Sequence, residues 1–113
     1  MDEERFPDTK SVEDQKADLT SANLYGAYLT NADLSGADLI GAELGTADLT
    51  DADLTGADLT DAKLIGANLY GADLTDANLT RADLTRADLS GAILEGVDLT
   101  SADLTGTILD KET

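Results

Sequence analysis

The sequence contains no cysteine, no histidine and no tryptophan, and it has one proline and one phenylalanine. Without cysteine and histidine it lacks disulfides, thiol nucleophiles, imidazole bases and the usual zinc ligands. It also has no glycine-rich phosphate loop and no EF-hand loop. We therefore expect no catalytic residue, no metal site and no cofactor. The absence of cysteine also means that no redox compartment is indicated.

Basic residues are scarce as well: 7 Lys and Arg stand against 24 Asp and Glu, for a formal charge of −17. Such a chain repels nucleic acid and anionic membranes, so we expect neither as a direct partner. A basic protein surface, including one that normally holds DNA, is the electrostatic complement. No apolar run reaches membrane-spanning length, and the start MDEERFPDTK has no apolar signal region. The expected location is cytoplasmic, unless a targeting segment has been removed.

One unit of five residues fills most of the chain, from residue 17 to residue 111, in nineteen consecutive copies. Its centre is always Leu, and Ala stands two positions earlier in seventeen copies. The predicted core leucines are Leu19, Leu24, Leu29, Leu34, Leu39, Leu44, Leu49, Leu54, Leu59, Leu64, Leu69, Leu74, Leu79, Leu84, Leu89, Leu94, Leu99, Leu104 and Leu109.

A period of five fits neither a helix nor a flat strand. On an α-helix, successive leucines would advance by about 140° and scatter around the axis. On a strand, Ala and Leu two apart share a face, but the next Ala, three further on, points to the other side. The chain must therefore turn a corner once per unit, so that each short side points its Ala and Leu inward. Repeated corners of one sense predict a solenoid with a Leu and Ala core.

The run A-[D/N]-L-x-x, as in ADLTD, ANLYG and ADLSG, resembles the pentapeptide repeat protein family. The resemblance covers residues 17–111. It implies an all-β fold: a right-handed quadrilateral β-helix with four units per coil and about five coils. At the usual strand spacing of about 4.8 Å, the coils would extend roughly 23 Å.

The two ends of the repeat are predicted to differ. Residues 1–16 are predicted to form an N-terminal capping segment, either a short helix with Ser11 as its N-cap or an extended segment. Phe6 and Val12 would cover the first coil. At the other end, residues 112–113 are a tail. Apolar residues interrupt the pattern there, and the family tends to pair through its C-terminal coils. We expect end-to-end dimerisation through Ile93, Val97, Leu104, Ile108 and Leu109.

With four units per coil, residues twenty apart stack in columns, and the position before each Leu forms columns of Asp. An Asp or Asn there can accept backbone hydrogen bonds and hold the turn. Eleven of these nineteen positions are Asp and only three are Asn. The excess of charge has two interpretations, solubility or a recognition surface. The candidate interaction surface consists of Asp18, Asp38, Asp58, Asp98, Asp33, Asp53, Asp73, Tyr25, Tyr28 and Tyr70.

These features favour a non-catalytic, rigid acidic rod that binds an unknown protein or serves as a structural module. The alternative is a DNA mimic that modulates a type II topoisomerase such as gyrase, as some members of the resembled family do. Those members are usually longer and often carry Phe at the unit centre, whereas every centre here is Leu. A remote alternative is ice binding through threonine columns, which residues 40, 45, 65, 70 and 95 interrupt.

Overall fold

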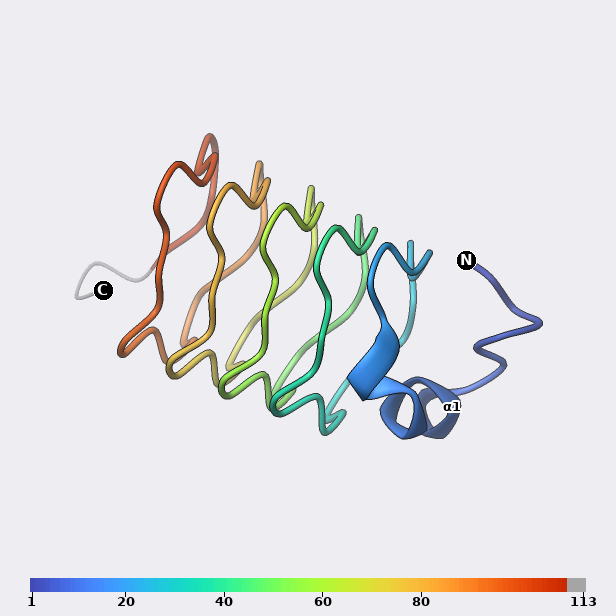
Figure 1. The fold of residues 1–113 in the computed structure, drawn as a ribbon. Coiled ribbons are helices and arrows are strands. Elements are labelled where there is room, and N and C mark those ends of the chain that lie inside the picture. Colours follow the sequence, from blue (N-terminus) through green and yellow to red (C-terminus); the bar gives the residue numbers. More distant parts are fainter. Residues whose placement is uncertain (110–113) are drawn as a thin grey trace.

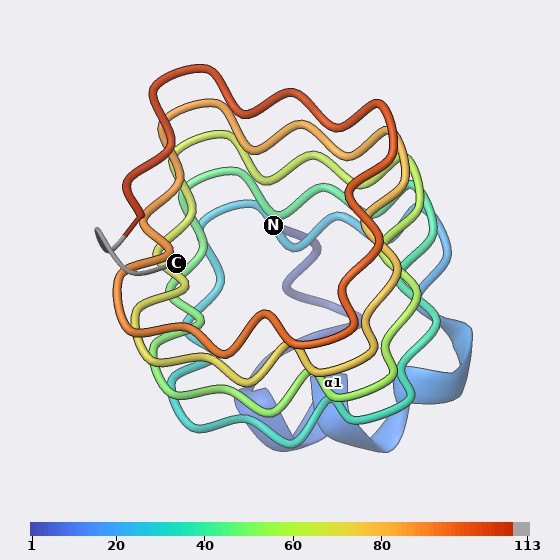
Figure 2. The same ribbon diagram turned by 90° about the vertical axis from the view of Figure 1, so that its left-hand side faces the viewer.

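The protein is represented by a computed structural model that describes residues 1–109. Positions 110 and 111 of the predicted repeat and the predicted tail, 112–113, lie outside the described residues. The chain begins with the helix α1 (Thr9–Asp14) and the 3₁₀ helix η1 (Lys16–Asp18). It then winds as a coil away from α1 (Figure 1). Viewed along the axis, the successive turns of the coil overlie one another as a four-sided tube (Figure 2).

Each corner of the coil is a tight turn built from the same five-residue unit. The carbonyl of every central Leu from Leu19 to Leu104 accepts a hydrogen bond from the backbone N–H three residues on. Within each turn, the second residue after Leu has a positive φ, from Ser21 to Gly106. This is the signature of a type II turn, whose third residue occupies the left-handed region that glycine and asparagine tolerate best. Nine of the ten glycines stand at these corners.

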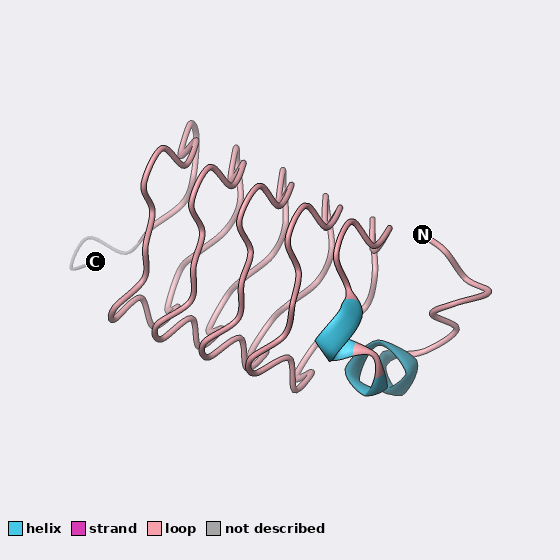
Figure 3. Cartoon of the chain, viewed as in Figure 1, coloured by secondary structure: helices cyan, strands magenta, loops and turns pink. Residues whose placement is uncertain are grey.

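The four sides of the coil are held to the next coil by parallel backbone pairing. Fourteen bridged pairs join residues twenty apart, beginning with Asn23 and Glu43 and ending with Asp88 and Ile108. Four units of five residues therefore complete one coil. The paired segments are too short to form continuous strands among the described residues (Figure 3). The pairing is that of a β-helix reduced to one bridge per side, because a corner follows immediately.

The core is a column of leucine with alanine beside it. Every central Leu from Leu19 to Leu89 is buried, as is every Ala two residues before a centre from Ala22 to Ala87. The prediction fails at both ends. Ala17 is exposed because it lies in η1 and not in a regular side.

The last leucines of the predicted core are also less buried than expected. Leu94 and Leu99 are only half-buried, while Leu104 and Leu109 are 39% and 43% exposed. A Leu is covered by the coil that follows it, and the described chain ends before another coil is laid down. These four residues therefore form the open end of the column.

The N-terminal segment folds over the opposite end of the column. Phe6 and Val12 are 1% and 2% exposed and belong to the same core as the leucines. The predicted N-cap at Ser11 is wrong: the helix begins at Thr9, and the cap is Asp8. The side chain of Asp8 accepts hydrogen bonds from both the N–H and the hydroxyl of Ser11. Val12 follows Asp8 by four residues. It therefore lies about one helical turn after the cap, where its side chain packs against the core.

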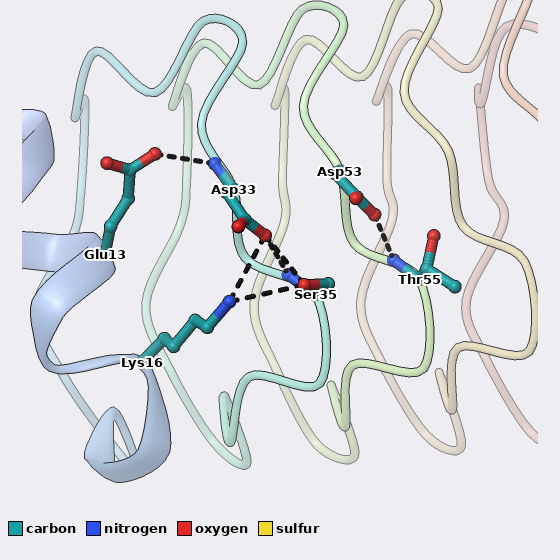
Figure 4. A network of polar contacts seen from close by, with 6 residues as sticks. All are labelled: Glu13, Lys16, Asp33, Ser35, Asp53 and Thr55. Atoms are coloured by element: carbon teal, nitrogen blue, oxygen red, sulfur yellow. Dashed lines mark hydrogen bonds and ion pairs between the residues drawn. The ribbon is translucent and has the colours of Figure 1, made fainter.

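Polar contacts fix this segment against the first complete coil (Figure 4). The Glu13 carboxylate accepts a hydrogen bond from the N–H of Asp33 at 2.7 Å. Lys16 Nζ lies 3.2 Å from Asp33 Oδ1 and 3.2 Å from Ser35 Oγ. In the later coils the equivalent backbone N–H donates to a backbone carbonyl of the coil before. The Glu13 carboxylate thus replaces that carbonyl as the acceptor at the start of the coil.

The described residues contain no helix that is both long and apolar enough to cross a membrane.

Position along the column should determine what each leucine contributes to stability. Replacing Leu54, which is fully buried in the middle of the column, by Ala should lower the free energy of unfolding by about 2–5 kcal/mol. The same change at the half-covered Leu104 should cost about 1 kcal/mol. Urea unfolding followed by far-UV circular dichroism measures both. Equal losses would contradict a column that is closed in the middle and open at the C-terminal end.

Candidate functional site

The outward carboxylates are part of the turns. At every Asp or Asn that precedes a central Leu from Asn23 to Asp103, the side-chain Oδ1 accepts a hydrogen bond from the backbone N–H two residues on, at 2.9–3.3 Å. This contact is an Asx turn. Its hydrogen bond closes around the central Leu and fixes the residue directly after that Leu, which is the first of the two middle residues of the corner turn.

Threonine hydroxyls reinforce these turns, a role that sequence reasoning missed. In seven units the Thr after the central Leu also donates its hydroxyl to the same Oδ1, at 2.5–2.7 Å. The signal is present in the sequence as the recurring D-L-T triplet. The hydroxyls are therefore directed to neighbouring carboxylates, which does not favour a free threonine lattice facing ice.

One unit shows that the turn needs an oxygen acceptor and not a charge. Asn78 accepts from the N–H of Thr80 at 3.0 Å and from its hydroxyl at 2.6 Å. Asp58, one coil earlier, makes the same two contacts with Thr60 at 3.1 and 2.6 Å. The negative charge of the other columns is therefore surplus to the turn.

The same hydrogen bonds lower the pKa of several of these carboxylates. The pKa of Asp48, Asp73, Asp98 and Asp103 lies below its usual range, first because a Thr hydroxyl donates to each and then because a backbone N–H does. For Asp33 the Ser35 hydroxyl, the Ser35 N–H and the Lys16 ammonium together lower the pKa to about 2. Repulsion between stacked like charges would raise these values, so the local hydrogen bonds are the stronger influence.

The carboxylates are not evenly distributed over the four sides. One side carries Asp33, Asp53 and Asp73 in successive bridged positions, with Asp76 and Glu95 beside them. We call these five residues the acidic face. Among the described residues its one ion pair is made by Lys16 of η1, at its N-terminal edge. Further along the coil, no basic residue stands in this side of the described chain.

The second predicted Asp column is less uniform. Asp38, Asp58 and Asp98 stack with Asn78 between the last two, but Asp18 lies in η1, outside the bridged column. A nearby corner carries an ion pair, in which Arg81 Nε and Nη2 donate to the two carboxylate oxygens of Asp61 at 2.9 and 3.2 Å. Arg81 thus balances the charge of Asp61. This side is therefore less acidic in net terms.

The three tyrosines lie on two adjacent sides of the coil. Tyr28 and Tyr70 project from one side of the coil and Tyr25 from the side before it. Tyr28 stands at the N-terminal end, where its carbonyl accepts a hydrogen bond from the Thr9 hydroxyl at 2.8 Å. All three rings are largely exposed. Their membership of one interaction surface stays a prediction.

The open end gathers the predicted apolar residues. Ile93, Leu104, Ile108 and Leu109 are all exposed there, and Val97 is partly buried against the core. Among the described residues, no group of three or more His, Cys, Asp or Glu side chains is arranged to hold a metal ion. The outward features that a partner could contact are therefore charge on the sides and apolar surface at the end.

Comparison with protein families gives one match, described as pentapeptide repeats, at residues 15–51, 47–81 and 77–111. No protein of curated function matches the sequence. Among solved structures, the chain is similar to Rfr23, a pentapeptide repeat protein from the cyanobacterium Cyanothece 51142. The identity is 47% over 81% of this chain and 63% of that one, with a TM-score of 0.79.

A pentapeptide repeat protein from the Arabidopsis thaliana thylakoid lumen is 35% identical over 80% of this chain and 63% of that one, with a TM-score of 0.77. The chain thus spans less than two thirds of the length of either protein. QnrB1, a plasmid-mediated fluoroquinolone resistance protein, is 21% identical over 81% of this chain and 67% of that one, with a TM-score of 0.51. That likeness shows the fold alone.

Asp58 can separate the turn contact from the charge. Asp58→Asn keeps the oxygen acceptor and should leave the free energy of unfolding within about 0.5 kcal/mol of the original. Asp58→Ala removes the acceptor for the N–H and hydroxyl of Thr60 and should cost about 1–2 kcal/mol. Urea unfolding at neutral pH measures both. Equal stability of the two variants would show that the side-chain contact does not hold the turn.

Proposed function

The chain belongs to the pentapeptide repeat family, and on that premise we propose that it is a non-catalytic rod that binds a partner protein through the acidic face. Pentapeptide repeat proteins are generally structural or interaction modules. The observation that carries the proposal is the surplus charge of Asp33, Asp53 and Asp73, since Asn78 makes the same turn contacts without charge. The partner is a protein with a basic surface, because a cationic surface complements such a face.

The rod is a right-handed quadrilateral β-helix of about five coils. Its handedness and coil number follow the family, and the pairing of residues twenty apart supports four units per coil. A regular backbone of this kind presents fixed charges at fixed spacing. Side chains tied by Asx turns lose little further freedom on binding, which favours recognition by a rigid surface.

A DNA mimic is the second candidate, and the charge density supports it. A duplex carries one negative charge per about 1.7 Å, or about 23 over the 39 Å length of this molecule. The chain carries a formal charge of −17. Its partner would then be the DNA-binding surface of a type II topoisomerase. The interaction module remains the first proposal because it requires only one acidic face and one complementary partner surface.

Self-association through the C-terminal end is part of the proposal. Ile93, Leu104, Ile108 and Leu109 are exposed around the open column, whereas Phe6 and Val12 close the other end. A rod with one open end and one closed end would form a two-fold dimer and would not extend into a filament. Pairing through this end would bury the leucines that are exposed there among the described residues.

Affinity capture from a lysate of the source cells tests the acidic face. The variant Asp53→Asn, Asp73→Asn, Asp76→Asn keeps three oxygen acceptors and removes three charges from that face. The control Asp48→Asn, Asp88→Asn, Asp103→Asn removes three charges from other sides. We expect the original chain and the control to retain the same basic protein, and the acidic-face variant to retain it at least about fivefold less. Equal retention by the two variants would contradict the proposal.

The same three proteins in a gyrase supercoiling assay test the second candidate. Inhibition or protection by the original chain that is lost in the acidic-face variant would support the DNA mimic. No effect at a large molar excess of the protein would exclude the DNA mimic. The capture experiment would still test the acidic face independently.

The dimer prediction is tested by sedimentation across a concentration series. Ile108→Asp places a charge on the apolar rim and should convert a dimer into a monomer at every concentration. Ile65→Asp, on a side of the coil, is the matched control and should leave the oligomeric state unchanged. A chain that is monomeric throughout, or a dimer that survives Ile108→Asp, would contradict end-to-end pairing.

A further inference from the structure

One side of the coil, which contains the bridged pairs Asn23–Glu43 and Lys63–Asp83, differs from the other three sides. In the described chain, two of the five departures from Asp or Asn before the central Leu lie there, Glu43 and Lys63. Three of the six departures from Thr or Ser after the central Leu also lie there, as Tyr25, Gly45 and Ile65. These five residues are contiguous on successive coils. The regular lattice is therefore interrupted at one place on this side.

Gly45 explains how the interruption shapes the surface. It is the one glycine whose φ lies outside the left-handed region, so the backbone does not require glycine there. A Cβ on Gly45 would lie 3.0 Å from Cδ2 and Cε2 of Tyr25. The ring of Tyr25 thus lies directly over Gly45, which is buried beneath it. Glycine leaves room here for the Tyr25 ring, and Tyr25, Gly45 and Ile65 line one hollow.

The hollow is a groove of about 490 Å³, within the range of small ligand-binding clefts. Tyr25 and Ile65 supply its apolar surface, and both remain partly exposed. Lys63 and Arg86 line it as well, opposite the single carboxylate of Glu43. Lys63 Nζ lies 3.8 Å from Glu43 Oε1, a long ion pair.

The charge of this groove is opposite to that of the rest of the chain. Three basic residues stand in the described repeat, and Arg81 is already bonded to both oxygens of Asp61. The other two, Lys63 and Arg86, both line the groove. The lining carries two cations and one carboxylate, and Asp83 adjoins Lys63 on the next coil. The groove is suited to an anion attached to an apolar group.

We propose that this groove binds a segment of a partner protein in which an apolar side chain neighbours a carboxylate. The apolar side chain packs between Tyr25 and Ile65, and the carboxylate accepts hydrogen bonds from Lys63 and Arg86. The groove is open along its outer side, so a partner surface completes the enclosure that a small free ligand would lack. The inference rests on the proposed interaction role and adds a second contact, opposite in charge to the acidic face.

Amide chemical shifts of the ¹⁵N-labelled full chain test the groove with defined probes. The probe is N-acetyl-Phe-Glu-amide, and its matched controls are N-acetyl-Phe-Gln-amide and benzoate. We expect saturable shifts at Tyr25, Gly45 and Ile65, with a millimolar dissociation constant. The amide control should bind up to about fivefold more weakly, as expected for an exposed ion pair.

Gly45→Thr places a Cβ 3.0 Å from the Tyr25 ring and should displace that ring from the groove, while the turn is kept because the φ of Gly45 is not left-handed. It should weaken probe binding at least about fivefold. Tyr70→Thr, on another side, should leave binding unchanged. Should Gly45→Thr fail to fold, Arg86→Gln provides the second variant, and it should abolish the preference for the Glu probe over the Gln probe.

Several results would overturn the proposal. The first two are the absence of saturable shifts and shifts that lie outside this side of the coil. The third is probe binding of the same strength after Gly45→Thr. Should that variant fail to fold, the third is an unchanged preference for the Glu probe over the Gln probe after Arg86→Gln. Benzoate that binds as tightly as the peptide probe would indicate a small-molecule site and would overturn the assignment to a partner segment. The titration does not involve the acidic face. If the probe does not bind in the titration while the acidic-face variant still loses its partner in the capture experiment, only the groove proposal is refuted.

Discussion

The corner at every fifth residue is the constraint on which the rest of the structure depends. A type II turn needs a residue in the left-handed region, and the chain supplies one at each corner from Ser21 to Gly106. Because the corners recur at a fixed interval, each short side has room for one bridged residue and one inward Ala–Leu pair. The column of leucine, the spacing of twenty between stacked residues and the outward position of the carboxylates all follow from that interval.

The outward Asp combines a structural role with an electrostatic one. Stacked like charges about 5 Å apart repel by about 0.8 kcal/mol in water before screening. The hydrogen bonds that Thr75 makes to Asp73 nevertheless lower the pKa of that carboxyl. Asn78 makes the same contacts without charge, so the choice of Asp over Asn adds a persistent negative surface to a turn that does not need it. Where that surplus is not balanced by Arg or Lys, it forms the acidic face.

Sequence alone gave the period, the corner and the central part of the core, because Leu and Ala at spacings of two and three have few ways to be buried together. The stacking at twenty came from family resemblance. Local errors arose where the repeat ends: Asp8 caps the helix in place of Ser11, and Leu104 is exposed because no described coil covers it. The groove was missed because Gly45 reads in the sequence only as an interruption of a threonine column. Its different role depends on a tyrosine twenty residues earlier.

The pH dependence of stability tests most directly whether turn hydrogen bonds outweigh charge repulsion. A carboxyl whose folded pKa is lowered stabilises the fold above its unfolded pKa of about 3.9, and that contribution is lost as the pH falls toward the folded value. For Asp33 the folded pKa is about 2. Urea unfolding measured from about pH 5 to about pH 2 should therefore show stability that falls with pH. Stability that rises as the carboxylates are protonated would show that repulsion dominates and would contradict this account.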